Sequence, residues 1–238
     1  MNMKTINMTI PELPYAAEEA LNRLRVNVKF SGKEIKTIMI SSSLPNEGKS
    51  HVAIYLWKML AEASFRTVLV DCDMRKSVMK KEMRFRCDEE YLGLDYYLSG
   101  LAEYEDVVHH TNIENGDIVP ITNLLQNPSS LLEDARFGEL FRTLENNYDY
   151  VIIDSPPLVS VSDGMLIAQY CDGAILIVRS GETPRRLIRQ SMNQLQQTDC
   201  RLLGTVLNGV ATGNRAYGRY YGYYSKYYSE YYGGKNDR

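Results

Sequence analysis

The segment at 37–50 constrains the fold of this 238-residue chain more than any other part of it. Its first four residues, Thr37–Ile40, are mostly apolar and predict a buried strand. Small residues follow and end in Gly-Lys-Ser at 48–50, and helical periodicity then continues to about Ala63. This order of strand, turn and helix is typical of a phosphate-binding loop, because the turn and the helix start present backbone N–H groups to an anion.

The loop departs from the usual pattern, in which a glycine and any four residues precede Gly-Lys-Ser/Thr. Ser43 stands at the first glycine position, and Asn46 stands where we expect a positive φ, which asparagine tolerates better than most residues. In the functional interpretation, Lys49 reaches the β- and γ-phosphates of a nucleotide and the Ser50 hydroxyl completes the shell of a Mg²⁺ ion. The alternative is a surface loop that contains Gly-Lys-Ser by chance.

Apolar segments alternate with helical ones along the rest of the chain. We expect further strands at 66–73, 150–154, 174–178 and 204–208, and helices at 15–30, 129–146, 162–170 and 183–197. Residues 75–130 are irregular, with a helical piece at 91–98. This alternation predicts an α/β fold of the P-loop NTPase type, a mostly parallel sheet with helices on both faces. The expected organisation is a flexible N-terminal arm at 1–14, one domain at 15–210 and a flexible tyrosine-rich tail at 211–238.

Composition excludes several classes of function. The net charge of −3 gives no overall field that would recruit nucleic acid. We expect no transmembrane helix, because the chain has no run of 18 apolar residues, and no signal peptide, because 1–14 lacks a charged and then an apolar region. The four cysteines have no Cys-x-x-Cys spacing, which favours reduced thiols over a metal site.

Polar residues lie at the ends of three of the expected strands. They are Asp71, Asp73, Asp154 and Asn208, and in parallel sheets ligands bind outside these carboxyl ends. Asp154 fits the metal-side acid of a Walker B motif, and the spacing of Asp71 and Asp73 puts both on one face of a strand, as a metal contact and a proton acceptor. The alternative for each acid is a turn or a helix cap.

Half of the 18 tyrosines lie in the last 22 residues. They are Tyr217, Tyr220, Tyr221, Tyr223, Tyr224, Tyr227, Tyr228, Tyr231 and Tyr232. A tyrosine-rich segment dotted with glycine is either a set of modification sites or simply an adhesive, disordered tail.

Three segments together with this tail resemble the bacterial tyrosine kinases (BY-kinases) that serve capsule and exopolysaccharide synthesis. They are Ser-Leu-Pro-Asn-Glu-Gly-Lys-Ser at 43–50, Val-Leu-Val-Asp-Cys-Asp-Met-Arg-Lys at 68–76 and Tyr-Asp-Tyr-Val-Ile-Ile-Asp-Ser-Pro-Pro at 148–157. The resemblance implies an ATP-dependent protein tyrosine autokinase, with Mg²⁺ as cofactor, that phosphorylates its C-terminal tyrosines between subunits. It implies catalytic roles for Lys49, Asp71, Asp73 and Asp154, and a cation held by Ser50, Asp71 and Asp154. The implied nucleotide contacts are Leu44, Pro45, Asn46, Glu47, Gly48, Lys49, Ser50, His51 and Asn208.

The resemblance also implies partners. The family forms ring-like homo-oligomers, such as octamers, through a Glu-x-x-Arg-x-x-Arg motif. Glu19 and Arg25 match this motif, whereas Asn22 replaces its first arginine and Arg23 lies beside it. A transmembrane activator or polysaccharide co-polymerase and a cognate tyrosine phosphatase are implied as well. The implied location is cytoplasmic, at the inner face of the plasma membrane through that partner.

Two other functions fit parts of the sequence. A regulatory P-loop ATPase of the septum-positioning or partition type shares the sheet and the acids, but such proteins carry a second lysine at the position of Leu44. A non-enzymatic scaffold would combine an inert nucleotide site with an adhesive tail. Labelled ATP separates the three functions, since they yield phosphotyrosine, free phosphate or neither.

Overall fold

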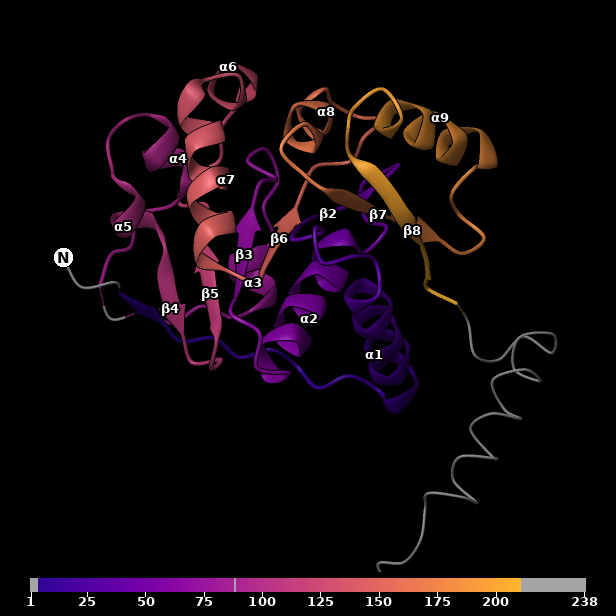
Figure 1. The fold of residues 1–238 in the computed structure, drawn as a ribbon, viewed down its shortest axis with the longest axis horizontal. Coiled ribbons are helices and arrows are strands. Elements are labelled where there is room, and N and C mark those ends of the chain that lie inside the picture. Colours follow the sequence, from indigo (N-terminus) through magenta and orange to yellow (C-terminus); the bar gives the residue numbers. More distant parts are fainter. Residues whose placement is uncertain (1–3, 88, 211–238) are drawn as a thin grey trace, which may run out of the picture.

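The computed structural model describes residues 4–87 and 89–210. The tyrosine-rich tail predicted at 211–238 therefore lies outside the described residues. Within them, the fold is the predicted α/β arrangement, a mostly parallel sheet with helices on both faces (Figure 1).

The sheet has eight strands in the order β1-β4-β5-β3-β6-β2-β7-β8. Only the β4–β5 pair is antiparallel among the strand pairs of the described residues. The strands are β1 Thr5–Ile6, β2 Thr37–Ser42, β3 Thr67–Asp71, β4 His109–Thr111, β5 Gly116–Val119, β6 Tyr150–Asp154, β7 Gly173–Arg179 and β8 Arg201–Asn208.

Helices cover both faces of this sheet, with α1 and α2 on one side and α7, α8 and α9 on the other (Figure 1). The helices are α1 Tyr15–Lys29, α2 Lys49–Glu62, α3 Met79–Glu82, α4 Leu94–Leu98, α5 Tyr104–Val107, α6 Ser129–Leu132, α7 Ala135–Asn147, α8 Asp163–Ala168 and α9 Arg185–Leu195. Among the described residues, no helix combines the length and the apolarity that crossing a membrane requires.

The alternation of side chains along the central strands divides the core into two layers. Ile38 and Ile40 of β2 pack on the side of α1 and α2, whereas Met39 packs on the side of α7 and α8. Both layers are buried because each face of a parallel sheet is covered by helices, which explains why the central strands are continuous apolar runs.

Some predicted elements were wrong in detail. The helix predicted at 129–146 is two helices, and the second starts at Asp134, whose side chain accepts the Arg136 N–H at 2.9 Å. The piece predicted at 91–98 begins only at Leu94. Strands β4 and β5, which lie within the region interpreted as irregular, were missed because they are short and rich in polar residues.

The prediction of a flexible N-terminal arm was wrong for its described part, residues 4–14. Strand β1 pairs with β4, and both Ile6 and Met8 are buried. The backbone N–H of Met8 donates to Asn112 at 2.7 Å, and the Tyr55 hydroxyl donates to the carbonyl of Pro11 at 2.6 Å. Two apolar side chains thus anchor a segment whose sequence has too little periodicity to predict a strand.

We expect Ile6→Ala to lower the free energy of unfolding by about 2 kcal/mol or more, since it removes a fully buried side chain and leaves a cavity. Urea denaturation followed by circular dichroism measures the change. Thr5→Ala is the matched control, because Thr5 lies in the same strand but is exposed. Equal midpoints for both variants would show that β1 adds nothing to the core.

Candidate active site

The loop between β2 and α2 has the backbone geometry that its sequence predicts. Asn46 has φ 65° and Gly48 has φ 94°, so the positive φ expected at Asn46 is confirmed. A Cβ atom on Gly48 would lie 2.1 Å from the Asn208 side-chain nitrogen. Glycine is therefore required at 48 by both its backbone conformation and its close neighbour.

Glu47 holds this loop in place from inside. Its side chain is buried and accepts the backbone N–H of Leu44 at 2.9 Å and the hydroxyl of Thr183. The Glu47 carbonyl accepts the Asn208 side-chain amide at 2.9 Å. The loop is thus fastened to the β7–α9 connection and to the end of β8, an arrangement that we call the loop clamp (Glu47, Thr183, Asn208).

The sequence did not predict the clamp role of Glu47 or Thr183, because each partner is remote in the chain. The sequence did predict that Asn208 lies at the carboxyl-terminal edge of the sheet, beside the loop. There Asn208 supports the loop through Glu47, and its side-chain oxygen accepts the N–H of Gly209 at 2.8 Å. Both of its polar groups therefore bond to the protein.

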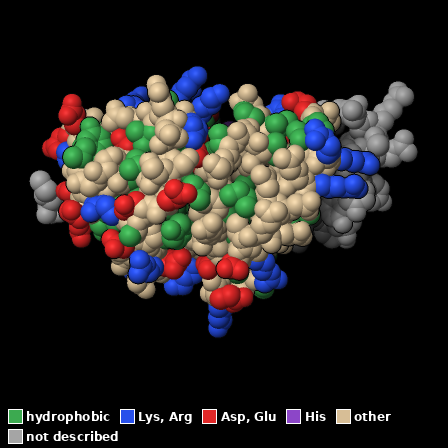
Figure 2. Space-filling view, turned by 90° about the horizontal axis from the view of Figure 1, so that it is seen from above, with side chains coloured by type: hydrophobic (Ala, Val, Ile, Leu, Met, Phe, Trp, Pro, Cys, Tyr) green, Lys and Arg blue, Asp and Glu red, His purple; other side chains and the backbone are tan. Residues whose placement is uncertain are grey.

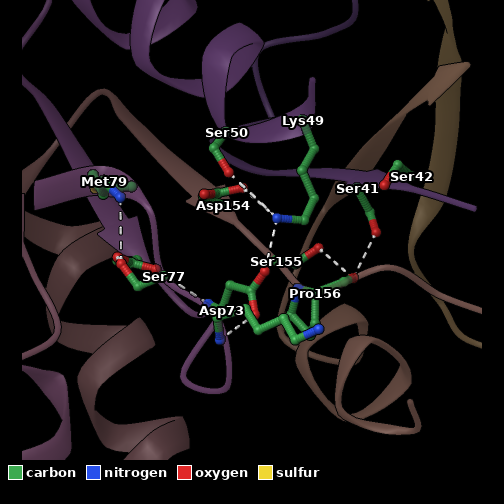
Figure 3. Close-up of polar contacts among 12 residues, drawn as sticks. Ser41, Ser42, Lys49, Ser50, Asp73, Ser77, Met79, Asp154, Ser155 and Pro156 are labelled. Carbon is green, nitrogen blue, oxygen red and sulfur yellow. Dashed lines mark hydrogen bonds and ion pairs between the residues drawn. The ribbon is translucent and has the colours of Figure 1, made fainter. Parts of the chain in front are cut away.

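Lys49 lies between two acids from neighbouring strands (Figure 3). Its amino group is 2.7 Å from a carboxylate oxygen of Asp73, 3.8 Å from one of Asp154 and 3.3 Å from the Ser50 hydroxyl. Lys49, Asp73 and Asp154 are all buried. Strands β3 and β6 bring the acids together, since Asp71 is in register with Asp154. The structure thus gathers the residues that the sequence placed at separate strand ends.

Burial and mutual repulsion govern the protonation of this cluster. Burial raises the pKa of Asp154, opposed by the nearby charge of Lys49. Burial, reinforced by the charge of Asp154, raises the pKa of Asp71 to about 8. Burial by itself would lower the pKa of Lys49, but the charges of Asp154 and Asp73 raise it by more. The net effect is a raised pKa, so that the Lys49 amine stays charged.

Asp71 has a different environment from the other two acids. It accepts the Ser77 hydroxyl and the backbone N–H of Asp73, the latter at 3.2 Å. These bonds order the turn after β3, which is the structural role that the sequence left open for such an acid. Asp71 makes no hydrogen bond or ion pair with Lys49 among the described residues.

The oxygen atoms of Ser50 and Asp154 fit a magnesium ion that arrives with a nucleotide. They are too few to hold the ion without phosphate and water. Both carboxylate oxygens of Asp154 are buried without a hydrogen bond within the described part of the chain. That part holds no group of three His, Cys, Asp or Glu side chains arranged for a metal. A Mg²⁺ ion here would combine the Ser50 hydroxyl, Asp154 through its free oxygens, water and phosphate oxygens, as is usual for this cation.

A cavity of about 740 Å³ opens beside the loop. This volume lies within the range of small-molecule sites. Its lining includes predicted contacts and further residues from the β3–α3 connection, α3 and the turn after β6: Pro45, Asn46, Gly48, Lys49, Ser50, His51, Asp73, Arg75, Lys76, Val78, Glu82, Pro156, Pro157, Ser160 and Val161.

Arg75 is partly exposed, and its guanidinium is held by neighbouring protein groups. Its guanidinium forms two bonds with Asp163, of 2.5 and 3.1 Å, and the Ser129 hydroxyl donates to the same carboxylate at 2.8 Å. Asp163, the first residue of α8, therefore has a role beyond starting the helix. Its carboxylate orients the Arg75 guanidinium at the wall of the cavity.

The predicted subunit-contact residues lie on α1, away from the cavity lining. Glu19 and Arg23 form an exposed ion pair at 3.7 Å, and Arg25 is half-buried. Exposed apolar side chains accompany them, with Phe30 84% exposed.

Comparison with known proteins agrees with this geometry. A family described as an AAA domain matches residues 35–183. The tyrosine-protein kinase CpsD of Streptococcus agalactiae serotype Ia is 39% identical over 201 residues, which cover 84% of this chain and 86% of that protein. The kinase domain of the Escherichia coli tyrosine kinase ETK superposes with a TM-score of 0.77 at 26% identity, over 90% of each chain. The VpsO kinase domain gives 0.75 at 30% identity, over 82% of this chain and 95% of that one. The chain belongs to the bacterial tyrosine kinase family.

Proposed function

We propose that this protein-tyrosine kinase uses Mg²⁺ and ATP to phosphorylate the tyrosines of its own C-terminal tail. The observation that carries the proposal is the position of Lys49, next to the phosphate-binding loop and between Asp73 and Asp154. Phosphoryl transfer depends mainly on positioning and charge neutralisation, and a cation between two acids at a helix start supplies both.

The roles of these residues follow from their contacts. Lys49 exchanges its bond with Asp73 for the nucleotide phosphates, which leaves the Asp73 carboxylate free to accept the proton of a tyrosine hydroxyl. The phenol oxygen then bonds to the γ-phosphorus as the bond to the departing ADP breaks. Ser50 and Asp154 would hold the cation, and Asp71, whose carboxylate already accepts the Ser77 hydroxyl, would support it from beside them. When bound, the Mg²⁺ ion neutralises charge on the phosphates.

The backbone of the loop from Leu44 to His51 holds the phosphates. The loop clamp fixes the backbone of this loop, since the Glu47 carboxylate accepts the Leu44 N–H and the Asn208 side chain lies against Gly48. The Leu44 N–H is therefore used within the loop, and Leu44 contacts the nucleotide through its other atoms. Asn208 thus serves the nucleotide by shaping the loop.

Phosphorylation takes place between subunits of a ring. About 20 tail residues extend to roughly 65 Å, which is enough to reach a neighbouring site. The exposed apolar side chains of α1, Tyr15 and Val26, support its role as the subunit contact. The exposed ion pair of Glu19 with Arg23 and the half-buried Arg25 lie on the same helix. The kinase regulates capsule or exopolysaccharide synthesis and export together with a transmembrane co-polymerase that holds it at the inner face of the membrane, and a tyrosine phosphatase reverses the modification.

We expect Asp73→Asn and Asp154→Asn each to lower tyrosine phosphorylation by 10²-fold or more, because they remove the proton acceptor and the cation-side carboxylate. Incubation with labelled ATP and Mg²⁺, followed by phosphotyrosine detection, measures the loss. Glu105→Gln is the control, since Glu105 is exposed on α5. Retained labelling in a folded variant would remove that acid from the mechanism, and free phosphate without phosphotyrosine in the wild type would favour a regulatory ATPase.

We expect Thr183→Val to raise the KM for ATP about 3- to 10-fold, since the Glu47 carboxylate loses the hydroxyl that fixes it. The kcat should change less, because Thr183 touches neither the acids nor Lys49. Thr183→Ser should restore the wild-type KM. Thr198→Val, which removes a hydroxyl at the end of α9, is the control. An unchanged KM in Thr183→Val would contradict the clamp.

We expect heavy phosphorylation to loosen the ring. From Ala211 on, the tail carries five Lys or Arg and two Asp or Glu, a net charge of +3. Four phosphates would bring this to about −3 to −5. Sizing of Lys49→Met, which cannot modify its tail, should show a larger oligomer than phosphorylated wild type. The same oligomer size in both would count against this effect.

A further inference from the structure

Helix α9 presents a basic face that the phosphoryl-transfer site does not use. Arg185, Arg186 and Arg189 are all exposed on this helix, while Ser191 and Leu195 are buried beneath it. Figure 2 shows Lys and Arg side chains projecting at the end of the molecule where α9 lies. A hollow of about 480 Å³ follows the same face, lined by Arg186, Arg189, Gln190, Asn193, Gln194 and Gln197.

These three arginines, the α9 arginine face, do not stabilise the protein by ion pairs. None of them forms a salt bridge with another described residue. The acid next to the helix, Glu182, is already paired with Arg179 at 2.9 Å. The first turn of α9 contains no acid, and cations there oppose the helix dipole. Arg185 and Arg186 in this turn therefore oppose the dipole, and all three exposed guanidinium groups can accept an anionic ligand.

The tail leaves the described structure next to this face. Strand β8 ends at Asn208, which pairs with Arg179, and its carbonyl accepts the N–H of Ser180 at 2.8 Å. Arg185 follows Ser180 by five residues, and α9 packs on β8. Tyr217 comes seven positions after Val210, a span of up to about 24 Å, whereas α9 is about 16 Å long. The first tail tyrosines are therefore within reach of the arginines.

Charge decides which form of the tail can bind there. The unmodified tail, with its net charge of +3, is repelled by three arginines. Each phosphate adds about −1.5 to −2 and offers oxygens that the arginine guanidinium binds in a bidentate manner. Only the phosphorylated tail is complementary to the α9 arginine face.

We propose that the α9 arginine face captures phosphotyrosines of this protein's own tail after the kinase has modified them. The inference rests on the proposed autophosphorylation. Capture withdraws the product from the active sites of neighbouring subunits, and leaves those sites to tails that still carry free hydroxyls. It also places the bound tail beside Thr183, two residues before α9, where the loop clamp is fastened.

Peptide binding to the full-length chain tests the capture separately from the kinase reaction. The protein is Lys49→Met, whose own tail stays unmodified, and the probe is a fluorescent peptide of residues 215–232 phosphorylated at Tyr220, Tyr221, Tyr223 and Tyr224. Fluorescence anisotropy should show binding of this peptide, at least tenfold weaker binding of the unmodified peptide, and a loss of affinity with salt. Because the peptide is synthetic, the result holds even if the chain does not phosphorylate itself.

Charge-matched variants identify the site. Arg186→Gln with Arg189→Gln should weaken binding of the phosphopeptide at least tenfold. Lys33→Gln with Arg84→Gln removes the same charge from exposed positions outside α9 and should leave binding within twofold. Equal affinity of the two double variants would overturn the proposal, as would equal binding of both peptides. Binding of the α9 face to phosphatidylserine vesicles in place of the phosphopeptide would assign it to a membrane, and would overturn the proposal too.

Protection of the modified tail gives a second readout. In autophosphorylated full-length protein, a general tyrosine phosphatase should release phosphate severalfold faster from the Arg186→Gln, Arg189→Gln variant than from the wild type. The Lys33→Gln, Arg84→Gln control should match the wild type. Identical release rates in all three proteins would show that the tail is not held.

Discussion

The buried charge of Lys49 is the interaction on which the site depends. An ammonium group away from water is tolerated only when carboxylates surround it, and here Asp73 and Asp154 do so from adjacent strands. The arrangement leaves Asp154 with two buried oxygens that no other described residue satisfies. Such a cluster can take up further charged groups, and a magnesium nucleotide would supply both an anion for Lys49 and a cation for Asp154.

The parallel sheet makes this cluster possible because it ends neighbouring strands at one edge. The register of β3 with β6 puts Asp71 opposite Asp154, and β2 delivers the phosphate-binding loop beside them. The clamp through Glu47 then fixes the loop to β8 and to the β7–α9 connection. The nucleotide site is therefore built by five segments, which strand pairing brings to one edge of the sheet and the side-chain bonds of the clamp fasten together.

The same connection links the nucleotide site to the point where the tail begins. Thr183 fastens the loop, α9 starts two residues later, and β8 ends beside them at Asn208. The tail tyrosines, which are the proposed substrates, follow in sequence from Tyr217 on. The geometry thus places nucleotide binding, the tail's origin and a basic helix face on one corner of the sheet, where a charge change in the tail acts at short range.

The sequence alone determined the strand–loop–helix unit, the positive φ at Asn46 and the acids at the strand ends, because each is encoded by neighbouring residues in a short pattern. It did not determine the two-residue strand β1 or the polar strands β4 and β5, whose pairing stabilises what their composition does not predict. Only the tertiary structure decided that Arg75 binds Asp163 and that Glu47 binds Thr183, since the partners are 88 and 136 residues apart. Long-range polar contacts of this kind leave no periodic signal in the sequence, because they depend on where the chain returns after folding.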